Sequence, residues 1–120
     1  MLQITPQTTI LVANQHVDFR KGIDGLAAFC RNHLKEEPMS GTFFLFYNRR
    51  ATTIKILTYD GQGFWLFIKR LSKGTFKTKP KLPANTIAQK ICYRTLLILI
   101  NNADPVAAKI PQDWRTLISN

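Results

Sequence analysis

Residues 42–69 read TFFLFYNRRATTIKILTYDGQGFWLFIK, and this stretch decides the fold. It contains three β-branched or aromatic runs, Thr42–Tyr47, Thr52–Tyr59 and Phe64–Lys69, separated by short loops rich in turn-forming residues. Runs of this kind joined by short loops predict antiparallel hairpins. A further turn follows at residues 71–74, so we expect Thr75–Lys77 to form a fourth strand that closes a β-meander.

The segment before the meander predicts one strand and one helix. Thr9–Ala13 is β-branched and apolar, as in a short strand. From Ile23, apolar residues recur at the helical period, and Pro38 and Gly41 mark the end of the helix. The apolar positions of this helix are Leu26, Ala27, Cys30 and Leu34.

The segment after the meander predicts a second helix. Residues 77–83 contain two prolines and three lysines, which favours an extended connector. Apolar residues between Tyr93 and Asn102 have helical spacing, which we favour over a buried strand at residues 97–100. Residues 103–120 carry one large apolar anchor, Trp114, and can close as a short terminal helix. We therefore expect a single α+β domain over residues 1–120, an antiparallel meander packed against the first helix.

The charge of the chain favours a polyanionic partner. Its 120 residues hold 17 Lys and Arg against seven Asp and Glu, a net charge of +10. Nucleic acid is the commonest such partner, although a ribosomal or membrane-surface role also fits the charge. The longest apolar stretch, Leu96–Ile100, cannot span a bilayer and no signal peptide is recognisable, so we expect a cytoplasmic protein with no membrane segment. In that reducing compartment we expect Cys30 and Cys92 to be reduced core residues.

The cations are concentrated in the predicted meander. Nine of the seventeen lie in residues 41–81, where Asp60 is the only acid. In a meander the loop at residues 48–51 and the turn after Lys69 lie at the same end of the sheet, which gathers their charges. Guanidinium groups bind two phosphate oxygens at once, and lysines add point charge. The alternative is a solvated sheet end that serves only solubility. The cations we expect to contact phosphates are Arg49, Arg50, Lys55, Lys69, Arg70 and Lys73.

Aromatic residues are interleaved with these charges. Exposed rings beside cations can stack on unpaired bases. The runs are apolar at alternate positions on both faces, however, which is typical of a sheet buried on both sides, and we favour core positions for most of the rings. The exposure of Tyr59 and of Trp65 would best distinguish stacking on bases from a position in the core.

A polar segment, residues 16–25, precedes the first helix and holds two carboxylates, two cations and two glycines. Such a segment can bind an anion at a helix N-terminus, with Arg20 and Lys21 assisting. It can also be structural, with Asp18 capping the helix and Arg20 pairing with Asp24, and this is the interpretation we favour.

Catalysis finds little support in the sequence. A two-metal nuclease needs about three carboxylates gathered around its cations. Asp18, Asp24 and Asp60 are a conceivable trio, but nothing in their spacing favours a shared site. Cys30 and His33 have the spacing of half a metal site, and no second pair matches them. We expect no catalytic residue, no metal site and no cofactor.

Two separate blocks of sequence resemble one known bacterial family. The first block is Val17–Leu26. The second lies within residues 40–76 and comprises Ser40–Phe46, Ile54–Leu57, Asp60–Leu66 and Lys69–Phe76. In order and spacing they resemble the small TnpB-type accessory protein of insertion sequence family sixty-six, which is encoded beside the main transposase. The resemblance covers about residues 9–76, whereas residues 77–120 diverge. The chain has Tyr59 where the family usually has Trp, and Ser72 where the family commonly has Glu.

The resemblance implies a non-catalytic protein that assists DNA transposition, the catalytic carboxylates belonging to a separate transposase. Its expected partners are DNA, either transposon ends or non-specific sequence, and the transposase of the same element. The family pattern gives weight to Asp18, Arg20, Lys21, Gly22, Asp24 and Gly25, and to Lys55, Lys69 and Arg70.

Three functions are therefore to be compared. The first is a DNA-binding accessory factor that contacts phosphates mainly without sequence readout. The second is an adaptor that binds the transposase through residues 18–25 and exposed aromatic rings. The third is a cryptic nuclease built on the three aspartates.

Overall fold

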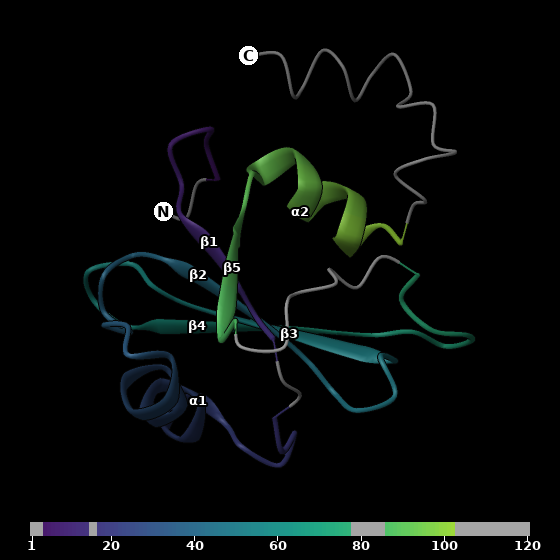
Figure 1. Ribbon diagram of the computed structural model, residues 1–120, viewed down its shortest axis with the longest axis horizontal. Helices are drawn as coiled ribbons and strands as arrows, with labels where there is room; N and C mark the ends of the chain where they lie inside the picture. The colour runs from purple at the N-terminus through teal and green to yellow at the C-terminus, as the bar shows by residue number, and fades with distance from the viewer. Residues whose placement is uncertain (1–3, 15–16, 78–85, 103–120) are drawn as a thin grey trace.

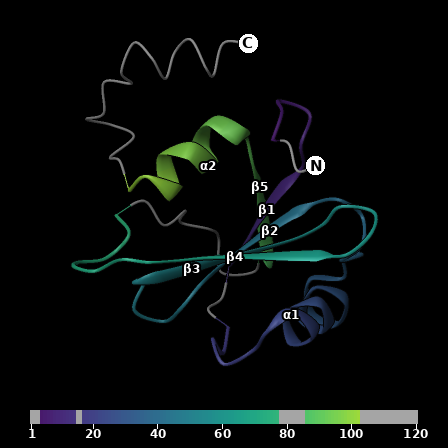
Figure 2. The same ribbon diagram turned by 180° about the vertical axis from the view of Figure 1, so that it is seen from behind.

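The computed structural model describes residues 4–14, 17–77 and 86–102. These residues form a five-stranded sheet with a helix on each face, an α+β arrangement as expected (Figure 1). The strands are β1 (Ile10–Ala13), β2 (Phe43–Tyr47), β3 (Thr53–Tyr59), β4 (Phe64–Arg70) and β5 (Ala88–Ile91). Helix α1 (Ile23–Phe29) continues into a π-helical turn at Cys30–Leu34, and α2 spans Tyr93–Ile100. In the view from behind the two helices again lie on opposite sides of the sheet (Figure 2).

The order of the strands in the sheet is β4-β3-β2-β1-β5. The predicted meander of β2, β3 and β4 is confirmed, because both of these pairs are antiparallel. Strand β1 is parallel to β2, and β5 is antiparallel to β1. The sheet as a whole is therefore mostly antiparallel, with one parallel pair. The parallel pair arises because α1 returns the chain to the end of the sheet where β1 started, so that β2 runs in the same direction.

The strands differ from the prediction in two places. Thr75–Lys77 forms no strand; instead the Phe76 ring is buried in the core and its N–H donates to the Ala51 carbonyl oxygen at 2.7 Å. Strand β5 was not predicted, because two of its four residues are polar and it is recognisable only through its pairing with β1. The predicted connector, residues 77–83, falls almost wholly outside the described residues, as does the predicted terminal helix at residues 103–120.

The core consists of two layers separated by the sheet. Successive side chains of β2 point to opposite faces, and all five are buried. Phe44 and Phe46 pack beneath α1, together with Leu26 and Cys30. The opposite layer is formed under α2 by Phe43, Leu45, Tyr47, Ile54, Ile56, Phe76, Leu96 and Leu99, among others. The four aromatic rings of β2 are therefore core residues, as the apolar runs predicted, whereas Trp65 and Phe67 on β4 are exposed.

Both predicted helices are present. The first begins at Ile23 and ends at Lys35, whose φ of 57° is left-handed. The spacing from Tyr93 to Ile100 forms a helix and not the alternative strand. Of the two cysteines, which are both free, Cys30 is buried but Cys92 is exposed at the start of α2, so the expectation that it is a core residue was wrong. No helix within the described parts of the chain has the length and apolar character needed to cross a membrane.

We predict that Phe76→Ala lowers the free energy of unfolding by about 3–5 kcal/mol, because it removes a ring from a packed core. The measurement is chemical denaturation followed by circular dichroism. Thr75→Ala is the matched control, since Thr75 is the exposed neighbour and its side chain is outside the core. Equal stability of the two variants would contradict the packing described for Phe76.

Candidate nucleic-acid interface

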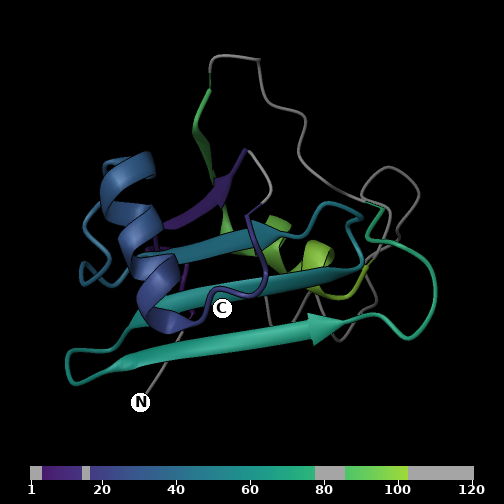
Figure 3. The same ribbon diagram turned by 90° about the horizontal axis from the view of Figure 1, so that it is seen from below.

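The turn between β2 and β3 and the chain after β4 lie side by side at one end of the sheet (Figure 3). The Leu71 N–H donates to the Thr52 carbonyl oxygen at 2.9 Å, and the Phe76 N–H donates to that of Ala51. The expectation that these two loops meet is confirmed. The topology therefore brings together two segments separated by some twenty residues of sequence.

Within the described residues, the charged side chains of these two loops are all positive, and we call this end of the sheet the basic end. Its exposed cations are Arg49, Arg50, Arg70, Lys73 and Lys77. Lys77 was not among the expected site residues, although it lies in the same cation-rich stretch. The two ion pairs in the described parts of the chain, Arg20 with Asp18 and Arg31 with Glu37, involve none of these five cations. Among the described residues their charges therefore have no ion-pair partner.

Asn48 fixes the turn that presents the two arginines. Its side-chain oxygen accepts from the N–H groups of Thr52 and Thr53 at 2.9 and 3.1 Å, and its amide donates to the Thr52 hydroxyl at 2.8 Å. The turn also needs a left-handed residue, and Ala51 adopts it with a φ of 56°. Arg49 and Arg50 therefore stand at the apex of a turn that is held by its own hydrogen bonds.

Asp60, the acid of the meander, lies at the opposite end of β3 from the basic end. Its carboxylate accepts hydrogen bonds from the N–H groups of Gln62 and Gly63, both at 2.9 Å, and from the Trp65 indole at 2.7 Å. These bonds lower the pKa of Asp60 to about 2. The carboxylate is thus an ionised part of the β3–β4 turn and does not neutralise the basic end.

Lys69 lies next to the basic end but points toward α2. Its ammonium donates to the Ile100 carbonyl oxygen at the last residue of the helix. A cation at a helix C-terminus is stabilising because it faces the negative end of the helix dipole. Lys69 is exposed and so can still reach a phosphate, but part of its hydrogen-bonding capacity is already used.

Lys55 is placed differently from the other expected phosphate contacts, and its expected role is corrected. It is only 7% exposed, on the α1 face of the sheet. Its ammonium donates to the carbonyl oxygens of Phe19 and Lys21 at 2.8 and 2.9 Å and lies 4.9 Å from the centre of the Phe19 ring. Lys55 therefore fastens the segment before α1 to the sheet and is not a surface contact.

The polar segment before α1 does not make the two contacts that were expected of it. Asp18 does not cap the helix: the N-cap is Gly22, which makes no side-chain cap bond. Arg20 pairs with Asp18 at 2.9 Å and not with Asp24, while Asp18 also accepts from the Arg20 N–H at 3.0 Å. The hydrogen bond from Arg20 lowers the pKa of the Asp18 carboxyl to about 2. The segment is thus ordered by a local turn and by Lys55.

Several residues of this segment line a hollow against α1. The hollow has a volume of about 330 Å³ and is lined by Asp18, Lys21, Gly25, Phe29 and His33, among others. A Cβ at Gly25 would lie 3.0 Å from the Lys21 Cβ, so a larger residue there would require the Lys21 side chain to shift by a few tenths of an ångström. Gly22 has open space around it and an extended backbone, so nothing in its surroundings explains the glycine. Asp24 is exposed in the first turn of α1.

The two aromatic rings singled out from the sequence differ in exposure. Trp65 is 48% exposed and stacks almost parallel on Phe67, with ring centres 5.9 Å apart. Tyr59 is half-buried and packs edge-on against Phe64. Trp65 lies on the face of β4 that α2 also covers, away from the Arg49 turn along the sheet, because it pairs with Thr58 near the end of β3.

The three aspartates of the conceivable nuclease trio do not come together as ligands. Asp18 is engaged by Arg20, and Asp60 is engaged in the β3–β4 turn. Within the described residues, no three His, Cys, Asp or Glu side chains are grouped so that they could hold a metal ion. The His33 ring stacks on the Phe29 ring, with ring centres 4.8 Å apart. Packing therefore accounts for the position of His33 near Cys30.

Comparison with known proteins gives the following similarities. The family model for the IS66 Orf2 like protein matches residues 8–109. The chain is 37% identical over 76 residues to y4hO of Sinorhizobium fredii, which covers 63% of the chain and 66% of that protein. It is 38% identical over 71 residues to y4jC of the same organism, covering 59% of the chain and 61% of that protein. Both relatives are described as uncharacterized, and the chain spans less than two thirds of the length of either. No solved structure matches the chain.

We predict that Lys55→Met lowers the free energy of unfolding by about 1–3 kcal/mol, because two carbonyl oxygens lose their hydrogen-bond donor. The measurement is urea denaturation. Lys90→Met serves as the control, since Lys90 is exposed on β5 and makes no comparable contact among the described residues. If Lys55→Met were as stable as the control, the role of Lys55 in fastening the segment would be wrong.

Proposed function

Because the chain belongs to the IS66 Orf2-like family, accessory proteins of IS66 elements in DNA transposition, we propose that it binds DNA through the basic end. The observation that carries this proposal is the convergence of two loops whose cations have no ion-pair partner in the described parts of the chain. The proposed phosphate contacts are Arg49, Arg50, Arg70, Lys73 and Lys77, with Lys69 at their margin.

The chemistry of the basic end suits phosphates better than base edges. Arginine forks bind phosphate oxygens in pairs, and release of condensed counterions from DNA provides the free energy of binding. Sequence readout usually uses a helix or a ribbon of strands inserted into a groove. The proposed contacts lie on turns, whereas both described helices are packed on the sheet. We therefore propose binding that is mainly independent of sequence.

The proposed role is non-catalytic. The two aspartates with lowered pKa values, Asp18 and Asp60, hold turns of the chain and so have structural roles. Phosphodiester hydrolysis by metal ions needs carboxylates that are gathered and free to bind the cations. The catalytic step of transposition is accordingly assigned to a separate transposase.

We predict that the double substitution Arg49→Ala and Arg50→Ala weakens binding to duplex DNA and makes it less dependent on salt. Loss of two phosphate contacts reduces the slope of log K against log salt by about 1.8, at about 0.9 per phosphate. The measurement is fluorescence anisotropy with labelled duplex at several salt concentrations. The matched control is Lys90→Ala with Arg94→Ala, which removes the same charge from exposed positions outside the basic end.

Two results of this titration would each count against the proposal. One is the absence of binding to either duplex or single-stranded DNA at low salt. The other is an equal loss of affinity in both double variants, because it would mean that net charge matters and the basic end does not.

The hollow beside α1 supports a second candidate function, an adaptor that binds the transposase protein. It presents an ionised carboxylate, a cation and apolar side chains together, as protein interfaces commonly do. Its residues Asp18, Lys21 and Gly25 belong to the segment that resembles the family pattern. This function is compatible with DNA binding because the hollow and the basic end involve different residues.

We predict for the adaptor that the tagged protein retains the transposase of its element after nuclease treatment, and that Lys21→Glu abolishes this retention by reversing a charge in the hollow. Arg20→Ala is expected to weaken it less, since the Arg20 side chain is 92% exposed and, among the described residues, pairs with Asp18 alone. The Arg49 and Arg50 double variant is the control and should retain the transposase. Retention that disappears with nuclease would attribute the association to DNA.

A further inference from the structure

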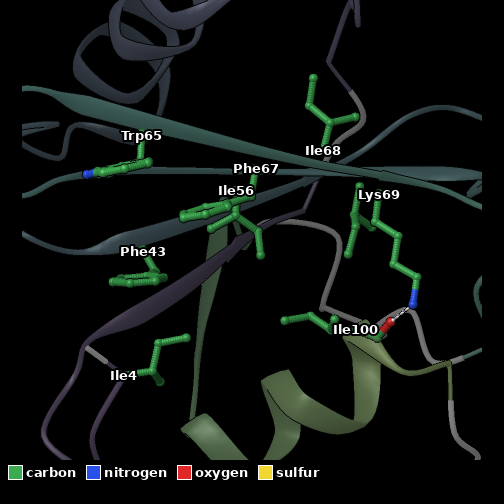
Figure 4. A pocket seen from close by; sticks show the side chains of 9 residues that line it. Ile4, Phe43, Ile56, Trp65, Phe67, Ile68, Lys69 and Ile100 are labelled. Carbon is green, nitrogen blue, oxygen red and sulfur yellow. Dashed lines mark hydrogen bonds between the residues drawn. The ribbon is translucent and has the colours of Figure 1, made fainter. Parts of the chain in front are cut away.

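The α2 face of the sheet is only partly covered in the described structure. Helix α2 packs over the central strands, and beyond it the face formed by β3 and β4 is hollowed into an apolar groove (Figure 4). The groove has a volume of about 630 Å³. Among the residues that line it are Phe43, Ile54, Ile56, Trp65, Phe67 and Ile100.

The rim of the groove exposes large apolar side chains to water. Trp65 is 48% and Phe67 42% exposed, and their rings lie flat against one another. Ile68 is 58% exposed, but it pairs with Lys55 and its side chain points to the opposite face of the sheet (Figure 4). Contiguous apolar surface of this kind is unusual in a monomer and indicates a missing covering element or a partner.

We propose that the C-terminal segment of this chain, residues 103–120, covers the groove intramolecularly. The described structure ends at Asn102, two residues after Ile100, whose side chain lines the groove. The ammonium of Lys69 on β4 binds the Ile100 carbonyl oxygen, so the end of α2 is fastened to the wall of the groove (Figure 4). The Asn102 side chain accepts from the Lys77 N–H and donates to the Thr75 carbonyl oxygen, so the segment that follows starts where the groove meets the loop after β4.

The sequence of this segment suits an apolar sheet face. Trp114, Leu117 and Ile118 are spaced by three and four residues, which places them on one side of a helix. Pro111 precedes them, and proline is favoured in the first turn of a helix. The eleven residues between Asn102 and Trp114 reach roughly 40 Å when extended, far more than is needed to return over β4.

The charges of the segment also favour the groove over the basic end. Asp104 and Asp113 balance Lys109 and Arg115, so its side chains add nothing to the net charge of +10. An electrically balanced segment with a large apolar side gains little from phosphates and much from burial. Docking would cover Trp65 and Phe67, which removes these rings from any stacking on bases and leaves the basic end exposed.

The test uses Trp65 as the reporter in the full-length chain. Trp114→Phe leaves Trp65 as the sole tryptophan while keeping an apolar ring in the segment. Its acrylamide quenching is compared with that of the same protein carrying Leu117→Asp and Ile118→Asp. The matched control carries Gln112→Asp and Thr116→Asp, which add the same charge on the opposite side of the proposed helix. Far-UV circular dichroism of each protein checks that the sheet is folded.

The proposal expects Trp65 to be quenched weakly in the parent and in the control. In the Leu117 and Ile118 variant, quenching should rise roughly twofold or more, because about half of the Trp65 surface is open when the groove is uncovered. Equal quenching in all three proteins would overturn the proposal. So would protection of Trp65 that increases with protein concentration together with dimers in sedimentation, since a second copy would then occupy the groove.

Discussion

The central strand β2 is buried over its whole length, and this burial determines where the other elements lie. All five of its side chains are inaccessible, alternating between the two faces of the sheet. A strand that is apolar on both faces needs a covering layer on each side. Helix α1 covers one face and α2 the other, while β1 and β3 satisfy the hydrogen bonds of the two edges of β2.

The parallel pairing of β1 with β2 has a further consequence for the placement of function. Because the two strands run in the same direction, the segment after β1 and the turn after β2 leave from the same end of the sheet. Strand β4 also finishes there, since it is antiparallel to β3. The fold thus gathers the chain segments that carry Arg20, Arg49 and Lys73 toward one end, and Lys55 holds the first of them against the sheet.

The parts of the fold that the sequence predicted are those set by local patterns. The meander at residues 42–69 depends on apolar runs and short turns, and α1 and α2 depend on helical spacing, all of which are visible within a few residues. Strand β5 is different, because Ala88–Ile91 has little strand character of its own and is defined by pairing with β1. Phe76 was mistaken for a strand residue because its apolar character is visible in the sequence, whereas its bond to Ala51 is not.

The same distinction applies to the candidate site. Arg49 and Arg50 were expected to contact phosphates because they lie in a hairpin loop, and both are exposed, as is usual for turns. Lys55 was misjudged because its partners, the carbonyl oxygens of Phe19 and Lys21, are more than thirty residues away in sequence. A charged residue in a strand reveals that it needs a partner, but only the tertiary structure shows whether that partner is solvent, phosphate or the chain itself.

The positions of the acids explain why the charged side chains in the loops of the basic end are all positive. Glu36 and Glu37 lie in the loop that leads to the start of β2, and Asp60 lies in the β3–β4 turn at that same end, opposite to the basic end. Asp18 is held by Arg20, so its charge is compensated locally. Three acids therefore lie at the end of the sheet opposite the loops that carry Arg49 and Lys73, whereas Asp18 and Asp24 lie just before α1 and in its first turn. An asymmetric charge distribution orients a polyanion, which a uniform net charge of +10 would merely attract.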